Sequence, residues 1–273
     1  MNAIAFDPSA VRTPDLARRR LLGLNNLVRK DVMEWLAGKR PWLVAGITTL
    51  VFVLAASNAR INAWILSAVP AESGSAPGKM LSLNPLDNLM AAIGTQFTIL
   101  AVIFATMGLL LAERDSGTLA WTISKPVSRT SVLLSKWLTS TLILWVAAVV
   151  IPLAVTTAVV TVLYGLPDLA TVLALGGALI TVPALFVAVS LAAATYVPSQ
   201  AAVAAIGVAV LVAPQIVGGL VPGITPFFPS SIYEWAVEAA VGASTSFITP
   251  IAWLIGLAVL FVLARRRVEA MDL

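Results

Sequence analysis

Residues 41–58, PWLVAGITTLVFVLAASN, contain no charged side chain. At about 1.5 Å per residue, a helix of this length nearly crosses the hydrocarbon core of a bilayer. Its apolar residues run on without alternation, which favours a helix over a barrel strand. The 273-residue chain is 59% hydrophobic and 11% charged, with a mean hydropathy of +0.96. A soluble core could not bury that much apolar surface, so the sequence predicts an all-α membrane protein.

Six stretches have the length and apolarity of a membrane-spanning helix, and together they predict a transmembrane domain over residues 41–264. Pro152, Pro183 and Pro214 lie inside these stretches and are expected to kink or interrupt their helices, because proline lacks an amide hydrogen. The six predicted spans are residues 41–58, 89–112, 137–164, 169–195, 201–222 and 248–264.

The basic residues predict the orientation of the chain. Of its 17 Lys and Arg residues, only Arg60 and Lys79 fall on one side of the six predicted spans. Because basic residues concentrate on the cytoplasmic side, residues 1–40 and the tail at 265–273 are expected in the cytoplasm and residues 223–247 outside. This pattern indicates a multi-pass protein of the cytoplasmic membrane, in contact with lipid and not with nucleic acid.

The segment before the first span has an apolar pattern of its own. A charged leader of this length is too long for a cleaved signal peptide, so we expect the first span to be retained. The apolar residues recur near helical spacing, which predicts an amphipathic helix along the inner membrane surface; the alternative is a polar tail without a defined partner. The recurring residues are Leu21, Leu24, Val28, Val32 and Trp35.

Few side chains here are suited to catalysis. The chain has no His and no Cys, which removes the commonest transition-metal ligands and thiol nucleophiles, and the predicted spans contain no ionisable residue. The stretch GSAPGK at 74–79 is one residue short of a phosphate-binding loop, and Met80 follows where that motif needs Ser or Thr. We therefore expect no metal, cofactor or nucleotide in this chain. Gln96 and Gln215 either line a substrate path or bond neighbouring helices together.

Residues 113–136, ERDSGTLAWTISKPVSRTSVLLSK, are the charged exception inside the apolar chain. They are more than a connection between two spans requires. Leu119, Trp121 and Ile123 form an apolar group framed by ionic residues, and Pro126 limits any helix that contains them. This arrangement is typical of a docking surface for another protein. The alternative is a loop whose apolar side chains contact lipid headgroups.

The same stretch closely resembles the cytoplasmic segment of ABC type-2 exporter permeases, whose pattern is Glu-Arg-x-x-Gly-Thr-Leu, a short helix, Lys-Pro-Val-Ser-Arg and a Lys at the following span. The resemblance implies a coupling helix within 116–125, seated in a separate ATP-binding cassette subunit. It also implies a dimer of permeases on a dimer of ATPases that bind the ATP and Mg. The matching positions are Glu113, Arg114, Gly117, Thr118, Leu119, Lys125, Pro126, Val127, Ser128, Arg129 and Lys136.

Roles for these residues follow as expectations. Glu113 and Arg114 would set the angle of the coupling helix, and Gly117 would allow the bend before it. Leu119, Trp121 and Ile123 would supply an apolar grip on the partner. Arg129 and Lys136 would contact either the partner or lipid phosphates.

Other functions remain open from the sequence. A secondary carrier would predict symmetry between the two halves, and a membrane enzyme would need a convergent set of acids, bases or ligands. A membrane anchor for a cytoplasmic complex would use the same docking loop. Near the last span, Ser231 and Glu234 have the spacing of a capping box, which predicts a short external helix. A gate role for that helix rests on fold analogy alone.

Overall fold

The computed structural model of the chain describes residues 23–68, 84–93, 96–118, 128–221, 223–243 and 246–270. Within these ranges the regular structure is helical, and six helical segments are long and apolar enough to cross a membrane, which confirms the predicted fold class. The helices are α2 (Leu24–Ala37), α3 (Arg40–Ala68), α4 (Pro85–Ile93), α5 (Phe97–Thr106), α6 (Leu109–Asp115), α8 (Arg129–Trp145), α9 (Ile151–Tyr164), α10 (Leu169–Ala178), α11 (Thr181–Tyr196), α12 (Gln200–Leu220), α13 (Ile232–Ala240) and α14 (Ile248–Glu269).

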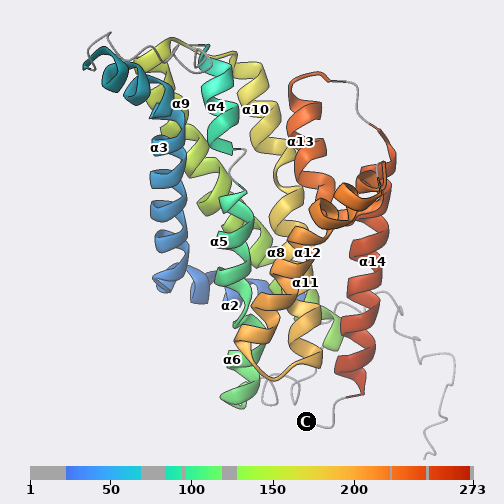
Figure 1. The fold of residues 1–273 in the computed structure, drawn as a ribbon. Helices are drawn as coiled ribbons and strands as arrows, with labels where there is room; N and C mark the ends of the chain where they lie inside the picture. The colour runs from blue at the N-terminus through green and yellow to red at the C-terminus, as the bar shows by residue number, and fades with distance from the viewer. Residues whose placement is uncertain are drawn as a thin grey trace, which may run out of the picture.

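Helix α11 forms the centre of the bundle. Every residue from Val182 to Thr195 is buried, as expected for a helix that is apolar on all sides. Helices α5, α8, α12 and α14 pack around it (Figure 1). The hydroxyl groups of Thr106 on α5 and Ser190 on α11 are 2.8 Å apart and satisfy each other inside this core.

The second predicted span, residues 89–112, is not a single helix. It consists of α4, α5 and α6, which together reach from Pro85 to Asp115. Gln96 precedes α5 with a φ of 52°, a left-handed conformation that no other described non-glycine residue adopts. Such a backbone conformation is sparsely populated outside glycine and stores local strain. The apolar run predicted the span but not its interruptions.

The third span is continuous but contains a wide turn. Between α8 and α9, Val146–Val150 form a π-helix, and the amide of Ile151 donates to the carbonyl of Val146, five residues back. Pro152 follows directly. A proline lacks the amide that a regular helix would use at this point, so the widened turn agrees with the predicted distortion.

The fourth span breaks just before Pro183. Helix α10 ends at Ala178 and α11 begins at Thr181. The amide of Ile180 donates to Gly177, and the carbonyl of Gly176 instead accepts a 2.7 Å hydrogen bond from the indole of Trp145. A side chain of α8 thus satisfies a backbone group that the break leaves free. By contrast, α12 runs through Pro214 without interruption.

The segment before the last span folds back against the bundle. Two 3₁₀ turns, Thr225–Phe227 and Pro229–Ser231, lead into α13, which packs on α10 with Ile232, Tyr233 and Ala236 buried (Figure 1). The Tyr233 hydroxyl donates to the carbonyl of Ile93. The helix after Ser231 was predicted correctly, but the capping box was wrong. Ser231 already has helical dihedrals, and its hydroxyl donates to the carbonyl of Thr225 at 2.8 Å.

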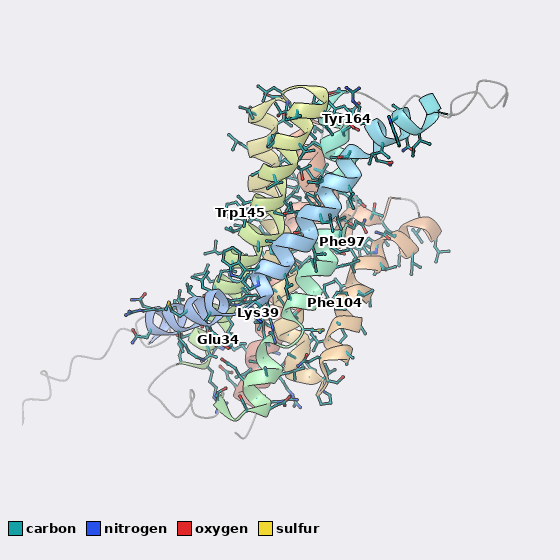
Figure 2. All side chains as sticks on the ribbon, turned by 90° about the vertical axis from the view of Figure 1, so that its left-hand side faces the viewer. Glu34, Lys39, Phe97, Phe104, Trp145 and Tyr164 are labelled. Carbon is teal, nitrogen blue, oxygen red and sulfur yellow. The ribbon has the colours of Figure 1, made fainter. Side chains whose placement is uncertain are left out.

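Helix α2 lies crosswise to α3 at one end of the bundle (Figures 1 and 2). It packs against α8 and buries Leu27, Asp31 and Trp35. The helical spacing and the burial of Trp35 agree with the predicted amphipathic helix, whereas Leu21 lies outside the described residues. The buried stripe has a carboxylate at its centre, and Asp31 is therefore the residue that needs an explanation.

Candidate functional site

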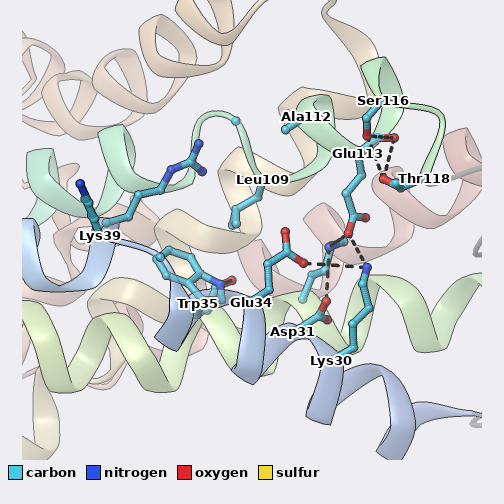
Figure 3. Close-up of a pocket in the computed structure, with 15 residues that line it drawn as sticks. Lys30, Asp31, Glu34, Trp35, Lys39, Leu109, Ala112, Glu113, Ser116 and Thr118 are labelled. Atoms are coloured by element: carbon cyan, nitrogen blue, oxygen red, sulfur yellow. Dashed lines mark hydrogen bonds and ion pairs between the residues drawn. The ribbon is translucent and has the colours of Figure 1, made fainter.

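Four charged side chains from three helices meet where α2 crosses the bundle. They are Lys30 and Asp31 of α2, Glu113 of α6 and Lys136 of α8, here called the charge cluster (Figure 3). One carboxylate oxygen of Glu113 lies 2.8 Å from the ammonium groups of both Lys30 and Lys136. The Lys136 ammonium also lies 3.5 Å from Asp31. The cluster is an alternating chain of two cations and two anions.

Burial makes these contacts more than surface ion pairs. The side chains of Asp31, Glu113 and Lys136 are only 5–8% exposed. Asp31 also accepts a 2.8 Å hydrogen bond from Ser135 on α8. An unpaired charge at such a depth is costly, so each member holds the others in place. Next to the cluster, the Trp35 indole donates to Ser140 at 3.1 Å, a second polar link between α2 and α8.

Lys30 forms the exposed edge of the charge cluster, with 45% of its side chain accessible. Partial burial alone would lower the pKa of its ammonium group. The hydrogen bond and charge of Glu113, with smaller contributions from Asp31 and Glu34, outweigh that effect and raise the pKa above its ordinary value. Lys30 is therefore charged throughout the physiological range.

Three carboxylates near this point could approach a cation. Oxygen atoms of Asp31, Glu34 and Glu113 lie within 4.8 Å of one another. However, carboxylate oxygens of Glu113 and Asp31 already contact the ammonium groups of Lys30 and Lys136. A metal ion would meet two positive charges there, so the donor set suits an internal salt bridge and not a metal centre.

The turn after Glu113 has a backbone that allows the chain to change direction. Gly117 adopts a φ of +72°, the left-handed conformation that commonly ends a helix and that glycine adopts without strain. The hydroxyl groups of Ser116 and Thr118 donate to the carbonyl of Glu113 at 3.3 and 3.2 Å. Arg114, 28% exposed, lies 4.0 Å from Asp115, a marginal ion pair. The chain thus reverses direction directly after the charge cluster.

At the other end of the connection, Ser128 caps α8 by accepting from the amide of Ser131 at 3.0 Å. The Arg129 guanidinium donates to the carbonyls of Val268 and Glu269 at 2.6 and 2.8 Å, at the last turn of α14. For Lys136, the expected lipid or partner contact is wrong, because its ammonium is buried on Glu113 and Asp31. Arg129 also has internal partners, and contact of its exposed part with another subunit stays a prediction.

The remaining predicted docking residues, Leu119, Trp121, Ile123 and Pro126, lie outside the described residues, as does the stretch at 74–79. Gln96 and Gln215 do meet, through a 2.9 Å hydrogen bond between their side-chain amides. This bond joins the start of α5 to α12. It supports helix pairing directly and is compatible with a place on a substrate path.

Comparison with protein families gives the chain its class. The family described as ABC-2 family transporter protein matches residues 25–273, which is almost the whole length. The chain belongs to the ABC-2 transporter family. No curated protein matches it. As a member of the ABC-2 family, it is a multi-pass membrane protein and a permease subunit without a nucleotide site of its own.

In this ABC-2 transporter, the sequence predicted a functional role for Glu113 but not the side chains with which it forms ion pairs. Lys30, Asp31 and Ser135 were missed, because their pairing depends on how α2 lies against α8. One signal was present. Leu27, Asp31 and Trp35 follow one another at four-residue spacing, so an acid in the middle of a buried helical stripe indicated a buried cationic partner.

Proposed function

We propose that this ABC-2 protein is the permease subunit of an ATP-driven exporter of the cytoplasmic membrane. A separate cassette subunit dimer would bind ATP and Mg, and a second permease chain would complete the transporter. The charge cluster is the observation that carries the proposal. It holds Glu113, at the start of the 113–136 connection, against Lys136, at its end. A segment that is anchored at both ends can transmit a displacement caused by a partner subunit to the helices at its two ends.

The path of that displacement follows from the contacts. Glu113 lies in the last turn of α6, and Lys136 lies about two turns into α8. Both also bind α2 through Lys30 and Asp31. When the cassette subunits close, the connection, α6, α8 and α2 would therefore move as one unit. Because α5 and α8 both pack against α11, the movement would reach the centre of the bundle.

The exposed face of α5 and α12 is where we place the second permease chain and the substrate path. A shallow cavity of about 1000 Å³ runs along this face, lined by Phe104, Met107 and a row of small residues of α12 that includes Ala205 and Ala209. Small residues permit close approach of another helix. The Gln96–Gln215 hydrogen bond lies at the end of this face farther from the charge cluster. The resemblance to exporter permeases supports export over import.

The docking part of the proposal is tested with Trp121→Asp in the transporter purified with its ATPase and reconstituted in liposomes. A carboxylate in the apolar grip should release the ATPase and remove most ATP hydrolysis, while the permease stays inserted. Trp64→Asp is the control, because Trp64 is 73% exposed near the far end of α3. Full ATPase retention and activity in the Trp121 variant would refute the docking assignment.

A second measurement separates a transporter from a passive membrane anchor. The chain has no Cys, so Ala209→Cys on the α5–α12 face introduces a single thiol. In a transporter, the rate of maleimide labelling at this position should change when ATP is added to the complex. An anchor would give the same rate with and without ATP.

A further inference from the structure

We propose that an anionic glycerophospholipid binds in the angle between α2 and α3. Its phosphate would lie against Lys39 and Arg40, and one acyl chain would fill the groove between α3 and α5. The site adjoins the proposed substrate path on the α5–α12 face, because Phe104 and Met107 line both spaces. It would fasten α2, and with it the charge cluster, to one leaflet of the membrane.

The headgroup part of the site is a cavity of about 670 Å³ between α2, α3 and α6. The charge cluster forms one end of this cavity, and Lys39 lies at the other end, beyond Trp35 (Figure 3). Arg40 also lines the cavity. The charges at one end of the cavity therefore compensate each other, whereas the other end carries the positive charges of Lys39 and Arg40.

The two basic residues at that end remain available for a ligand. Lys30 and Lys136 are engaged by Glu113 and Asp31. Within the part of the chain that the structure describes, neither Lys39 nor Arg40 forms an ion pair, and both are exposed. Helix α3 also begins here, and the first amides of a helix favour an anion. A phosphate is the anion that a membrane surface supplies.

The acyl-chain part is an apolar groove of about 410 Å³ between α3 and α5. Arg40 and Gly108 line both the groove and the headgroup cavity, so the two spaces adjoin. Gly108 contributes no side chain at the junction. Figure 2 shows Phe104 and then Phe97 on α5, rising beside α3 from the level of Lys39. The apolar residues that line the groove include Leu43, Ile47, Phe97, Leu100, Ala101 and Phe104.

A basic cavity that continues into an apolar groove matches the charged headgroup and the acyl chain of an anionic phospholipid. Leu43, Ile47 and Phe104 are 50–60% exposed, so the groove is open at the side, where lipid chains surround a membrane protein. A free phosphate would occupy only the basic end. A second copy of the chain would cover the groove without using the headgroup cavity. A phospholipid fills both.

The basic end is tested by native mass spectrometry of the full-length protein in detergent, titrated with dioleoyl-phosphatidylglycerol. One lipid should bind per chain, and phosphatidylcholine should bind more weakly. Lys39→Gln/Arg40→Gln should lower the affinity for phosphatidylglycerol roughly tenfold or more, since each basic side chain near the surface contributes to anionic lipid binding. Arg266→Gln, which removes an exposed charge from the end of α14, should leave the affinity unchanged. Equal binding by the double variant and the wild type would overturn the proposal.

The groove is tested separately by Ala101→Trp, which fills it from α5. Ala154→Trp on the exposed face of α9 is the matched control. Only the first variant should lose the lipid. Displacement of the lipid by glycerol 3-phosphate at equal concentration would identify a free-phosphate site instead. Loss of a chain dimer in Ala101→Trp, without any bound lipid in the wild type, would assign the groove to a second copy. Either result rejects the lipid site.

Discussion

The ammonium of Lys136 and the carboxylate of Glu113 lie 2.8 Å apart, and both side chains are 8% exposed. Glu113 lies near the end of the second span and Lys136 lies about two turns into the third, so the two residues flank the connection between these spans. Their contact holds α6 and α8 together below the connection. Lys30 and Asp31 attach α2 to the same pair of residues. The anchoring of the proposed docking segment is therefore electrostatic and buried, and it can be tested one charge at a time.

Lys136→Met should destabilise the protein far more than Lys30→Met. The first substitution leaves two buried carboxylates with only Lys30 to compensate, and breaking such a pair costs about 3–5 kcal/mol. The second removes a half-exposed lysine, whose ion pairs are worth about 0–1 kcal/mol. Chemical unfolding in mixed micelles measures the difference. In Glu113→Gln/Lys136→Met the loss should be smaller than the sum of the two single losses. Equal losses in the two lysine variants would contradict the pairing.

Trp145→Phe should cost about 1 kcal/mol of stability, because the Gly176 carbonyl at the α10–α11 break then loses its 2.7 Å donor. Trp137→Phe is the matched control. Its indole donates to Ala184 at 2.8 Å, but that carbonyl lies inside α11 and keeps its helical partner. Trp137→Phe should therefore lower the thermal unfolding temperature less than Trp145→Phe does. A loss in Trp137→Phe as large as in Trp145→Phe would show that the break needs no side-chain donor.

The orientation of the chain can be measured with single cysteines, since the wild type has none. Ser116 follows α6, and Leu166, 66% exposed, lies between α9 and α10. With the basic end in the cytoplasm, a membrane-impermeant maleimide should label Leu166→Cys in intact cells and Ser116→Cys only in inverted vesicles. The opposite labelling pattern would place the charge cluster and the proposed docking segment outside the cell.

The start of α10 should show a defined pH dependence. Asp168 accepts hydrogen bonds from the hydroxyl of Thr171 and from the amides of Thr171 and Ala170, which hold the pKa of its carboxyl below its ordinary value of 3.8. The lowered folded-state pKa means that the ionised cap contributes its full stabilisation above pH 3.8 and loses it as the pH falls through the folded-state value.

The Tm of the wild type should therefore exceed that of Asp168→Ala by a constant margin above that pH and by a shrinking margin below it. Asp168→Asn keeps a capping oxygen without a titrating group. Its margin over the alanine variant should not change across the same acidic range. A wild-type margin that also stays constant there would show that the cap is not ionised.

Much of the architecture was predictable, because long apolar runs and basic flanks are local properties of the chain. The six spans, the helix around Trp35, the bend at Gly117 and the distortion near Pro152 followed from residue type and spacing. The interruption at Gln96 did not, since an apolar run predicts a span whether or not the helix inside it is continuous.

The site was predictable only in part. Glu113 and Gly117 were found from their motif, but the partners of Glu113 come from segments far away in the sequence. Lys136 was expected to contact either the partner or lipid phosphates, because a lysine at the end of an apolar run usually reaches the membrane surface. Its burial follows from the position of α2, which covers this end of α8. Tertiary packing, and not local pattern, decides between the two environments.

The widened turn at Val146–Val150 lies between two halves of the third span that face different neighbours. Helix α8 faces α2 and α11, while α9 faces α3 and α4. A regular helix advances about 100° per residue, whereas a π-helical turn holds about one residue more, so the wider turn takes up one additional residue while the helix beyond it keeps nearly the same face toward its neighbours. Removing one residue of this turn would therefore restore the regular hydrogen-bond ladder and leave Val160 enclosed, whereas removing one residue of α9 before Val160 would rotate that side chain by about 100° and expose it. The widened turn is thus the one place in the third span where the length of the chain can change without altering which side chains α9 presents to α3 and α4.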